Sequence, residues 1–417
     1  MTQFGHGQSN PTYKVDCVRG VSSSASPLAT YVLRKKPPGK ILSSAHAVER
    51  EYAVQKALGA LSSPRVPVPR MATLCEDASV VGTPFYLMSF ARGHIFLQPG
   101  LESLPSAAHR AAVYDAMADT LGALHRVDPK EAGLEGFGKP DAYSRRQVER
   151  WARQYRESVV TPEPFMTELI EWLRAHVPPS EPSGRIVHGD FRLDNLVFAN
   201  ANGPLGDASG GNAPRDARRA ETGVVAVLDW ELATVGAPYS DVAYCCMPYH
   251  LPSVDAANPG MASTAYPAFG ASIPDGVPSE KAFVRRWARA AGLPNPTEGA
   301  SAATRWPFYV AMSLFRGAAI LAGVRARGGG ERQRGERARR GDAGGNARHA
   351  CVIGRGVRPG WRPARGGVCW KNVRAACFGI LRPRAVGARG GVAAAPSRVH
   401  GGARSSRGGG AGGARRV

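Results

Sequence analysis

Short apolar runs alternate with turns over the first ninety residues. Alternating β-branched and aromatic residues predict strands over residues 13–19 and 30–34, and a Pro-Pro-Gly turn at 37–39 ends the second strand. Apolar residues at helical spacing predict a helix over 44–58, whose other face is charged. A compact apolar run at 85–88 predicts one more buried strand. The pattern therefore predicts two strands, a helix and at least one further strand.

After residue 105 the pattern becomes helical, with short strand-like runs between the helices. The expected helices cover residues 107–127, 145–158, 164–176 and 280–324, and residues 224–228 are an expected strand. Short apolar runs at 186–187 and 196–198 come before it. A Gly-, Ala- and Asn-rich stretch at 200–222 follows the second of these runs and predicts a disordered loop insertion.

Composition changes this picture most at the carboxyl end. Residues 325–417 contain 23 Gly and 21 Arg without helical or strand periodicity, so we expect a disordered tail. The tail holds 22 of the 54 basic residues and three of the 33 acidic ones. It therefore accounts for +19 of the formal net charge of +21, and the rest of the chain is nearly neutral.

Two interpretations of this tail stay open. One is an Arg/Gly-rich arm that associates with RNA, although such arms interleave aromatic residues and only Trp361, Trp370 and Phe378 occur here. The other, which we favour, is out-of-frame translation of GC-rich DNA. Gly, Ala, Arg and Pro have GC-rich codons, and the change of composition after Val324 is abrupt.

Other features argue against the membrane and secreted classes. The chain lacks a run of about 18 uncharged apolar residues, since the longest apolar run, 308–324, contains Arg316. The first ten residues show no signal or transit pattern. Seven cysteines without a CxxC pair favour a reducing compartment, either the cytoplasm or an organelle. The hydrophobic content of 43% is sufficient for a sizeable core.

Two motifs in chain order carry the candidate chemistry. Residues 188–195, with the sequence HGDFRLDN, have the H-x-D-x4-N spacing of a kinase catalytic loop. Further along, the apolar run 224–228 leads directly into Asp229-Trp230-Glu231, where kinases place a metal-binding D-F-G. The alternative is a helix-capping aspartate and an ion-paired aspartate at a strand end. The order and spacing of the two motifs together favour phosphoryl transfer.

Phosphoryl transfer from Mg·ATP requires positioning and charge neutralisation more than covalent chemistry. Asp190 can accept the proton of an attacking hydroxyl group. Asn195 and Asp229 offer the hard oxygen ligands that Mg²⁺ prefers. Arg192 is a candidate to neutralise the transferring phosphoryl group, and its alternative role is an ion pair with Asp194.

The amino end supplies candidates for nucleotide binding. Gly7, Ser9 and Asn10 can present backbone N–H groups to phosphate oxygens, although a plain turn explains them equally well. Aligned on the kinase V-A-I-K strand, Arg34 takes the position of the phosphate-pairing lysine. Glu51, in the following helix, is the expected ion-pair partner of that cation, and the alternative is an ordinary surface glutamate.

With these motifs the chain resembles the aminoglycoside phosphotransferase/choline kinase-like family. It is most similar to the kinase-like domain of members that are fused to an acyl-CoA dehydrogenase. The resemblance covers roughly residues 4–324. It is carried by the segments 7–13, 31–39, 50–52, 188–195, 228–231 and 236–244, and by 306–309 and 315–316.

The resemblance implies an α+β, protein-kinase-like bilobal fold. A small β-rich lobe over residues 1–92 would lack its first strand, and a larger helical lobe over 93–324 would precede the disordered tail. Residues 88–91, with Met88 and Phe90, would form the hinge that meets adenine. Asp241 would support the catalytic loop.

Three functional hypotheses follow. The leading one is an ATP- and Mg²⁺-dependent kinase that phosphorylates a hydroxyl group of a small molecule, with hydroxyacyl-CoA compounds suggested by the fused members. The second is a truncated, non-catalytic pseudokinase, and the third is RNA association through the tail. A protein kinase is disfavoured, because no A-P-E segment follows Asp229. We expect the acceptor pocket near Tyr155, Tyr249 and Trp306, unless these aromatic residues belong to the core.

Overall fold

The structure, a computed structural model, describes residues 1–4, 10–18, 27–37, 47–199, 223–251, 267–269, 272–299 and 302–341. All of them fall within one compact unit. The expected phosphate-binding Gly7 and Ser9, the loop insertion at 200–222 and the tail from 342 onward lie outside the described residues.

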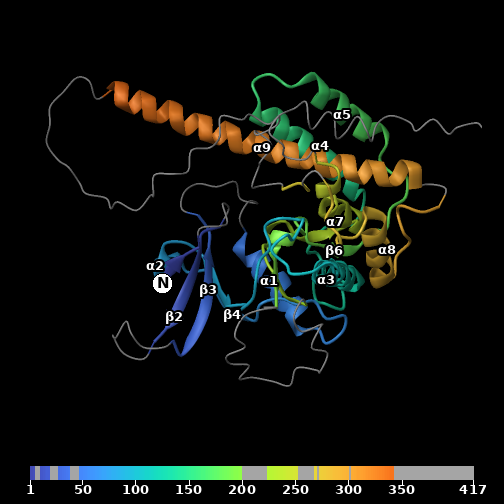
Figure 1. Cartoon of the computed structure of the whole chain (residues 1–417). Helices are drawn as coiled ribbons and strands as arrows, with labels where there is room; N and C mark the ends of the chain where they lie inside the picture. Colours follow the sequence, from blue (N-terminus) through green and yellow to red (C-terminus); the bar gives the residue numbers. More distant parts are fainter. Residues whose placement is uncertain are drawn as a thin grey trace, which may run out of the picture. The chain divides into compact units, whose positions relative to one another are not determined.

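A five-stranded antiparallel sheet forms the small lobe, in the order β1-β2-β3-β5-β4 (Figure 1). Its strands are β1 (Thr2–Gln3), β2 (Thr12–Cys17), β3 (Ala29–Lys35), β4 (Met71–Cys75) and β5 (Phe85–Ser89). The expectation that the first strand is missing is wrong, because Thr2 and Gln3 pair with Lys14 and Tyr13. A strand of two residues is too short to produce a recognisable period of alternation.

Helix α1 (Val48–Ala60) follows the sheet strands β2 and β3, as the helical spacing predicted. Two neighbouring elements escaped prediction, namely β4 and the short helix α2 (Ala78–Val81). The β4 segment, MATLC, lacks clear apolar alternation, and its strand conformation comes from pairing with β5 across a register shift. Pairing with a neighbouring strand, rather than local pattern, therefore decides this edge of the sheet.

The large lobe is mainly helical. Its helices are α3 (Ala107–Arg126), α4 (Tyr143–Ser158), α5 (Pro164–Ala175), α7 (Pro238–Cys245), α8 (Glu280–Ala291) and α9 (Ala302–Gly341). Helix α3 packs against α8, while α4 and α7 pack against α9 (Figure 1). Their inward faces join one large apolar core with Trp287, Tyr309 and Phe315 among its fully buried side chains.

Two short antiparallel strand pairs carry the motif residues into the large lobe. Strand β6 (Arg185–Val187) pairs with β9 (Thr234–Gly236), and β7 (Leu196–Phe198) pairs with β8 (Val224–Val227). Each turn that bears a motif is therefore bounded by hydrogen-bonded strands. A one-turn 3-10 helix, Leu193–Asn195, lies within the first motif, and another, Trp230–Leu232, lies within the second.

Helix α9 corrects the expected start of the disordered tail. The helix does not end at Val324 but continues to Gly341. Gly328–Gly330 disfavour a helix, but residues 331–340 are mostly Arg, Glu, Gln and Ala, which are good helix formers. Extending an existing helix also avoids the nucleation step. The part Arg305–Val324 is long and apolar enough to cross a membrane by length and composition, but 72% of it is buried inside the fold. Packing in the large-lobe core therefore accounts for its apolar character.

Candidate active site

The catalytic-loop motif begins where β6 ends, and its glycine is required by geometry. Gly189 has φ of +82°, in the left-handed region, and an added Cβ would lie 2.7 Å from the carbonyl oxygen of Leu232. Any other residue at this position would combine backbone strain with a steric clash. The glycine thus permits the close approach of the loop to the Asp229 segment.

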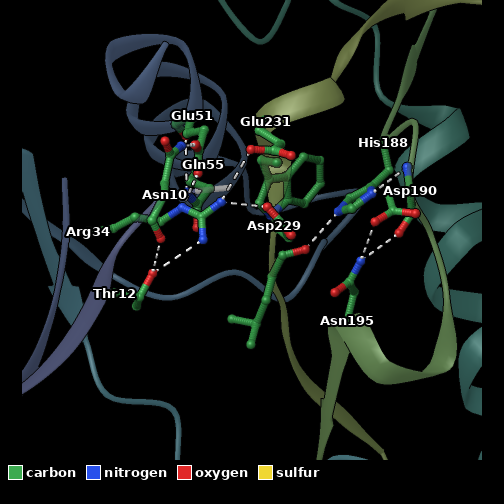
Figure 2. Close-up of polar contacts among 12 residues, drawn as sticks. Asn10, Thr12, Arg34, Glu51, Gln55, His188, Asp190, Asn195, Asp229 and Glu231 are labelled. Carbon is green, nitrogen blue, oxygen red and sulfur yellow. Dashed lines mark hydrogen bonds and ion pairs between the residues drawn. The ribbon is translucent and has the colours of Figure 1, made fainter. Parts of the chain in front are cut away.

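His188 joins the two motifs. Its buried ring accepts a hydrogen bond from the Asp190 N–H at Nδ1 (3.1 Å), and its Nε2 lies 2.9 Å from the Leu228 carbonyl oxygen (Figure 2). Because Nδ1 accepts, the proton of a neutral ring is on Nε2, which donates to that carbonyl. The ring also packs on Trp230, with centroids 4.6 Å apart. One imidazole therefore fixes the proposed base relative to the residue that precedes Asp229.

Asn195 orients Asp190. The Asn195 side-chain amide donates to the Asp190 backbone carbonyl at 2.8 Å and to its carboxylate Oδ2 at 3.0 Å. The side-chain oxygen of Asn195 consequently points away from Asp190, as Figure 2 shows. The Asp190 side chain is 20% exposed, so a substrate hydroxyl can reach it.

Arg192 makes the ion pair that was its alternative interpretation. Its Nη2 lies 2.5 Å from Asp194 Oδ2, and its Nε lies 3.6 Å from Asp190 Oδ1. Burial raises the pKa of Asp194, and the charge of Arg192 opposes that rise. Arg192 thus lies beside the proposed base while bonding mainly to Asp194.

Asp229 adopts an unusual backbone conformation, with φ of +63° and ψ of +62°. A non-glycine residue in this region costs about 1–3 kcal/mol and is maintained by its surroundings. Here the next residue, Trp230, is buried and donates from its indole N–H to the Val227 carbonyl at 2.9 Å. The buried tryptophan anchors the turn and leaves the Asp229 carboxylate 27% exposed at the site.

Arg34 connects the small lobe to the second motif. Its Nε lies 2.8 Å from Glu51 Oε2, and its Nη2 lies 2.6 Å from Asp229 Oδ1 and 3.7 Å from Glu231 Oε2 (Figure 2). Burial acts to lower the pKa of Arg34, but the charges of Asp229 and Glu51 outweigh burial and raise it. The guanidinium therefore stays charged among three carboxylates.

Glu51, the expected partner of Arg34, is fully buried in α1. Its carboxylate also accepts hydrogen bonds from the Asn10 amide at 2.6 Å and from the Tyr86 hydroxyl at 3.0 Å. Burial raises the pKa of Glu51 and Arg34 opposes the rise. The side chain of Asn10 thus contacts Glu51, and its backbone N–H is the group expected at the phosphates. No local signal in the sequence indicates this contact over 41 positions.

The expected hinge residues differ in their surroundings. The Met88 side chain lies in the small-lobe core with Val32 and Tyr86, so only its backbone is available to a nucleotide. The ring of Phe90 stacks on Phe4, with centroids 6.5 Å apart, and the Lys14 ammonium lies 5.8 Å from it.

The oxygen donors at the site fit a magnesium ion. In the described part of the chain, no group of three or more His, Cys, Asp and Glu side chains could hold a metal by itself. Mg²⁺ in phosphoryl-transfer enzymes usually takes only one or two protein carboxylates and completes its shell with phosphate and water oxygens. The Asp229 carboxylate and the Asn195 amide oxygen are compatible with that pattern.

Asp241 holds the start of the catalytic loop by hydrogen bonds, as the resemblance implied. Its buried carboxylate accepts the His188 N–H at 2.6 Å and the Gly189 N–H at 2.8 Å. His125 Nε2 lies 3.3 Å from the same carboxylate, and the Trp287 indole donates to His125 Nδ1 at 3.0 Å. Burial acts to raise the pKa of Asp241, but its hydrogen bonds and the nearby histidines lower it overall. The sequence pattern indicated neither His125 nor Trp287.

A mainly apolar pocket opens beside the catalytic loop. Arg192 and Asp194 mark its polar side. Its other lining residues are Leu97, Pro99, Tyr114, Met117, Leu193, Tyr244, Cys245, Met247, Pro248, Leu251 and Pro267. Of the aromatic residues expected around the acceptor, Tyr155 and Trp306 are buried in the core, and Tyr249 packs on Phe269.

Comparison with known proteins gives consistent matches. The sequence profile described as the phosphotransferase enzyme family matches residues 1–268. The chain is 41% identical over 350 residues to the Arabidopsis thaliana protein named probable acyl-CoA dehydrogenase IBR3, covering 81% of this chain and 38% of that protein. It is 36% identical over 328 residues to human acyl-CoA dehydrogenase family member 11, covering 78% and 36%. The chain thus spans little more than a third of the length of these relatives.

Solved structures show the same architecture. An aminoglycoside phosphotransferase-like protein from Ralstonia eutropha JMP134 is 37% identical, with a TM-score of 0.58, over 78% of this chain and 82% of that chain. Choline kinase from Cryptosporidium parvum is 14% identical, with a TM-score of 0.50, over 78% and 83%. The second match shows the kinase-like fold alone.

Proposed function

This chain belongs to the phosphotransferase enzyme family, and we propose that it transfers the γ-phosphoryl group of ATP to a hydroxyl group of a small molecule. The observation that carries the proposal is the assembly of Asp190, Asn195 and Asp229 through His188, with Arg34 beside Asp229. A scaffold protein would need none of these contacts, which argues against the pseudokinase hypothesis.

In the proposed reaction the oxygen of the acceptor hydroxyl attacks the γ-phosphorus while the bond from that phosphorus to the bridging oxygen breaks and ADP leaves. Asp190 accepts the proton of the hydroxyl. The Asn195 amide holds one carboxylate oxygen at 3.0 Å, and the second oxygen is left to receive the proton. Positioned bases of this kind contribute about 10²–10⁴-fold to the rate. Arg192, 3.6 Å from Asp190, places a positive charge near the same hydroxyl.

Asn195 and Asp229 would hold Mg²⁺, which when bound neutralises phosphate charge and orients the γ-phosphoryl group. Arg34 brings a second, permanent positive charge to the side of Asp229. Its fork geometry lets it bond Glu51 and Asp229 at once, which a single lysine ammonium does less well.

For the acceptor, we propose a hydroxyacyl compound such as a hydroxyacyl-CoA. The pocket beside Asp194 is lined mostly by apolar side chains, which suit an acyl chain better than a polycationic sugar. Residues 1–324 are nearly neutral and therefore lack the excess of negative charge that would attract a polycation. The names of the curated relatives, acyl-CoA dehydrogenases, agree with this class of acceptor.

The test of nucleotide use is a thermal-unfolding experiment on the full chain. Mg·ATP at about 100 times its dissociation constant should add about 2.7 kcal/mol to the stability, and ATP with a chelator should add far less. Radiolabelled γ-phosphate should then appear on a hydroxyacyl thioester and not on its deoxy analogue. Absence of any Mg·ATP shift in a cooperatively folded sample would favour the pseudokinase. A shift without transfer would redirect the search for the acceptor.

A further inference from the structure

Helix α1, which carries Glu51, is shared between the two hydrophobic cores. Val48 belongs to the core of the small lobe, while Val54 and Leu58 belong to the core of the large lobe. All three side chains are at most 1% exposed. The helix is therefore packed on both lobes along its length.

The residue before Glu51 ties this helix to the large lobe by polar contacts. The Arg50 guanidinium donates to the Phe137 carbonyl at 2.6 Å and reaches the Ala233 carbonyl at 3.5 Å. It also lies 4.2 Å from the centre of the Phe137 ring. One side chain thus contacts both the loop after α3 and the segment just beyond Asp229.

The Phe137 loop is itself held in place. The next residue, Gly138, lies so close to β9 that an added Cβ would overlap Thr234 and the Val235 N–H. Phe137 is buried in the large-lobe core. Arg50 therefore bonds to a rigid part of the large lobe.

Two further backbone contacts join the segments around α1 and the inter-lobe connection to the large lobe. The Val227 N–H donates to the Pro67 carbonyl at 2.9 Å, just after α1. In the connection between lobes, His94 and Phe198 exchange two N–H to carbonyl bonds of 2.8 Å each. The chain segment after α1 is thus bonded to β8, and the inter-lobe connection is bonded to β7. These two strands lie next to the two motifs.

We propose that α1 is fastened to the large lobe before nucleotide binds, and that Arg50 is the positioning residue that sets Glu51, and through it Arg34, against Asp229. This inference rests on the proposed phosphotransfer function. Its consequence is that the enzyme has a pre-assembled ion-pair array rather than one completed by a swing of α1. Arg50 acts through Glu51 and touches no substrate.

Hydrogen exchange on the full chain tests this directly, with the non-hydrolysable analogue AMP-PNP and Mg²⁺ as probe. In the unmodified protein, protection of α1 amides should change less than about twofold when the probe binds, because the helix is already ordered. In Arg50→Met, ligand-free protection of α1 should fall about tenfold, as for loss of one charge-assisted hydrogen bond. The KM for ATP should rise by a similar factor while kcat at saturation changes less.

Matched variants separate position from charge. Lys56→Met removes an exposed cation that lies 5.7 Å from the Tyr52 ring in the same helix, and should leave protection and KM unchanged. Arg50→Lys keeps a donor for Phe137 but cannot also reach Ala233, and should give an intermediate effect. If Arg50→Met does not fold, protection and KM are compared between Arg50→Lys and the unmodified protein.

Two results would overturn the inference. One is a tenfold or greater gain of α1 protection when the probe binds the unmodified protein. The other is identical ligand-free protection in Arg50→Met and Lys56→Met. Failure of the proposed function looks different, because the protein would then show no Mg·nucleotide shift at all. The comparison of ligand-free variants would still decide the role of Arg50.

Discussion

At the scale of single residues, the site is a set of carboxylates whose surroundings give them different roles. Asp190 is partly exposed and oriented by Asn195, Asp229 faces Arg34, and Asp241 is fully buried under the catalytic loop. Exposure leaves Asp190 accessible to substrate, whereas the hydrogen bonds to Asp241 outweigh the effect of its burial and keep it ionised. Reactivity at this site is therefore decided by environment rather than by residue type.

Asp190→Asn should remove the base while preserving shape. We expect kcat to fall about 10²–10⁴-fold with the Mg·ATP thermal shift retained, because the nucleotide contacts are unchanged. Asp77→Asn, at the exposed N-cap of α2, is the control and should keep full activity. Equal transfer rates for Asp190→Asn and the unmodified enzyme would rule out the proposed base.

Asp241 gives a pH signature of stability. Its pKa in the folded chain is below the ordinary value of 3.8. A lowered pKa stabilises the fold above the unfolded-state pKa, and this stabilisation is lost as pH falls from there through the folded-state pKa. Urea unfolding of the unmodified protein and Asp241→Asn should therefore differ most above pH 4 and converge in more acidic buffer. A constant difference across this range would contradict the assignment.

At the scale of elements, the catalytic loop depends on turns that bring β6 and the Asp229 segment close together. Gly189 and Gly184 both have positive φ, of +82° and +75°, and both flank β6. Only Gly189 has a close neighbour, the Leu232 carbonyl. Substitution of Gly184 therefore tests backbone strain alone, whereas substitution of Gly189 tests strain together with a steric clash.

Gly184→Ala should lower the free energy of unfolding by roughly 1–2 kcal/mol, because alanine is disfavoured in the left-handed region. Activity should stay intact. Gly189→Ala should cost more and abolish most transfer, because its Cβ would push the loop from Leu232. Denaturant unfolding and initial rates on both variants check this. Equal effects of the two substitutions would show that the close approach is unimportant.

At the scale of the whole molecule, charge and catalysis occupy different parts of the chain. Residues 342–417 hold 15 basic residues and one acidic residue, whereas the motif residues and Asp241 lie before position 242 and the pocket residues before position 268. The long-range field of the protein is thus governed by the carboxyl end.

Removal of residues 342–417 should leave the Mg·ATP shift unchanged. Any binding to RNA should be lost with them, since it would depend on these cations and weaken steeply with salt. Fluorescence anisotropy with a labelled RNA at several salt concentrations measures this. Salt-dependent RNA binding that survives the deletion would place a nucleic-acid surface on the kinase-like part.

The sequence by itself determined the features that depend on neighbours along the chain. The longer helices, several strands and the two motifs follow from local periodicity and spacing, so Asp190, Asn195 and Asp229 could be selected and the family inferred. The helical pattern of 280–324 was also visible, but the continuation of α9 to Gly341 was not, because a charged, Gly-interrupted stretch has no apolar face to detect.

Only the tertiary structure decided which distant residues meet. The bond from Arg34 to Asp229 spans 195 positions, that from His125 to Asp241 spans 116, and that from Arg50 to Phe137 spans 87. Such contacts leave no periodic trace, because they depend on how two lobes pack and not on the spacing of either segment. These distant partners also keep buried groups charged against the cost of burial: Arg34 stays charged among carboxylates, and Asp241 stays ionised inside the fold.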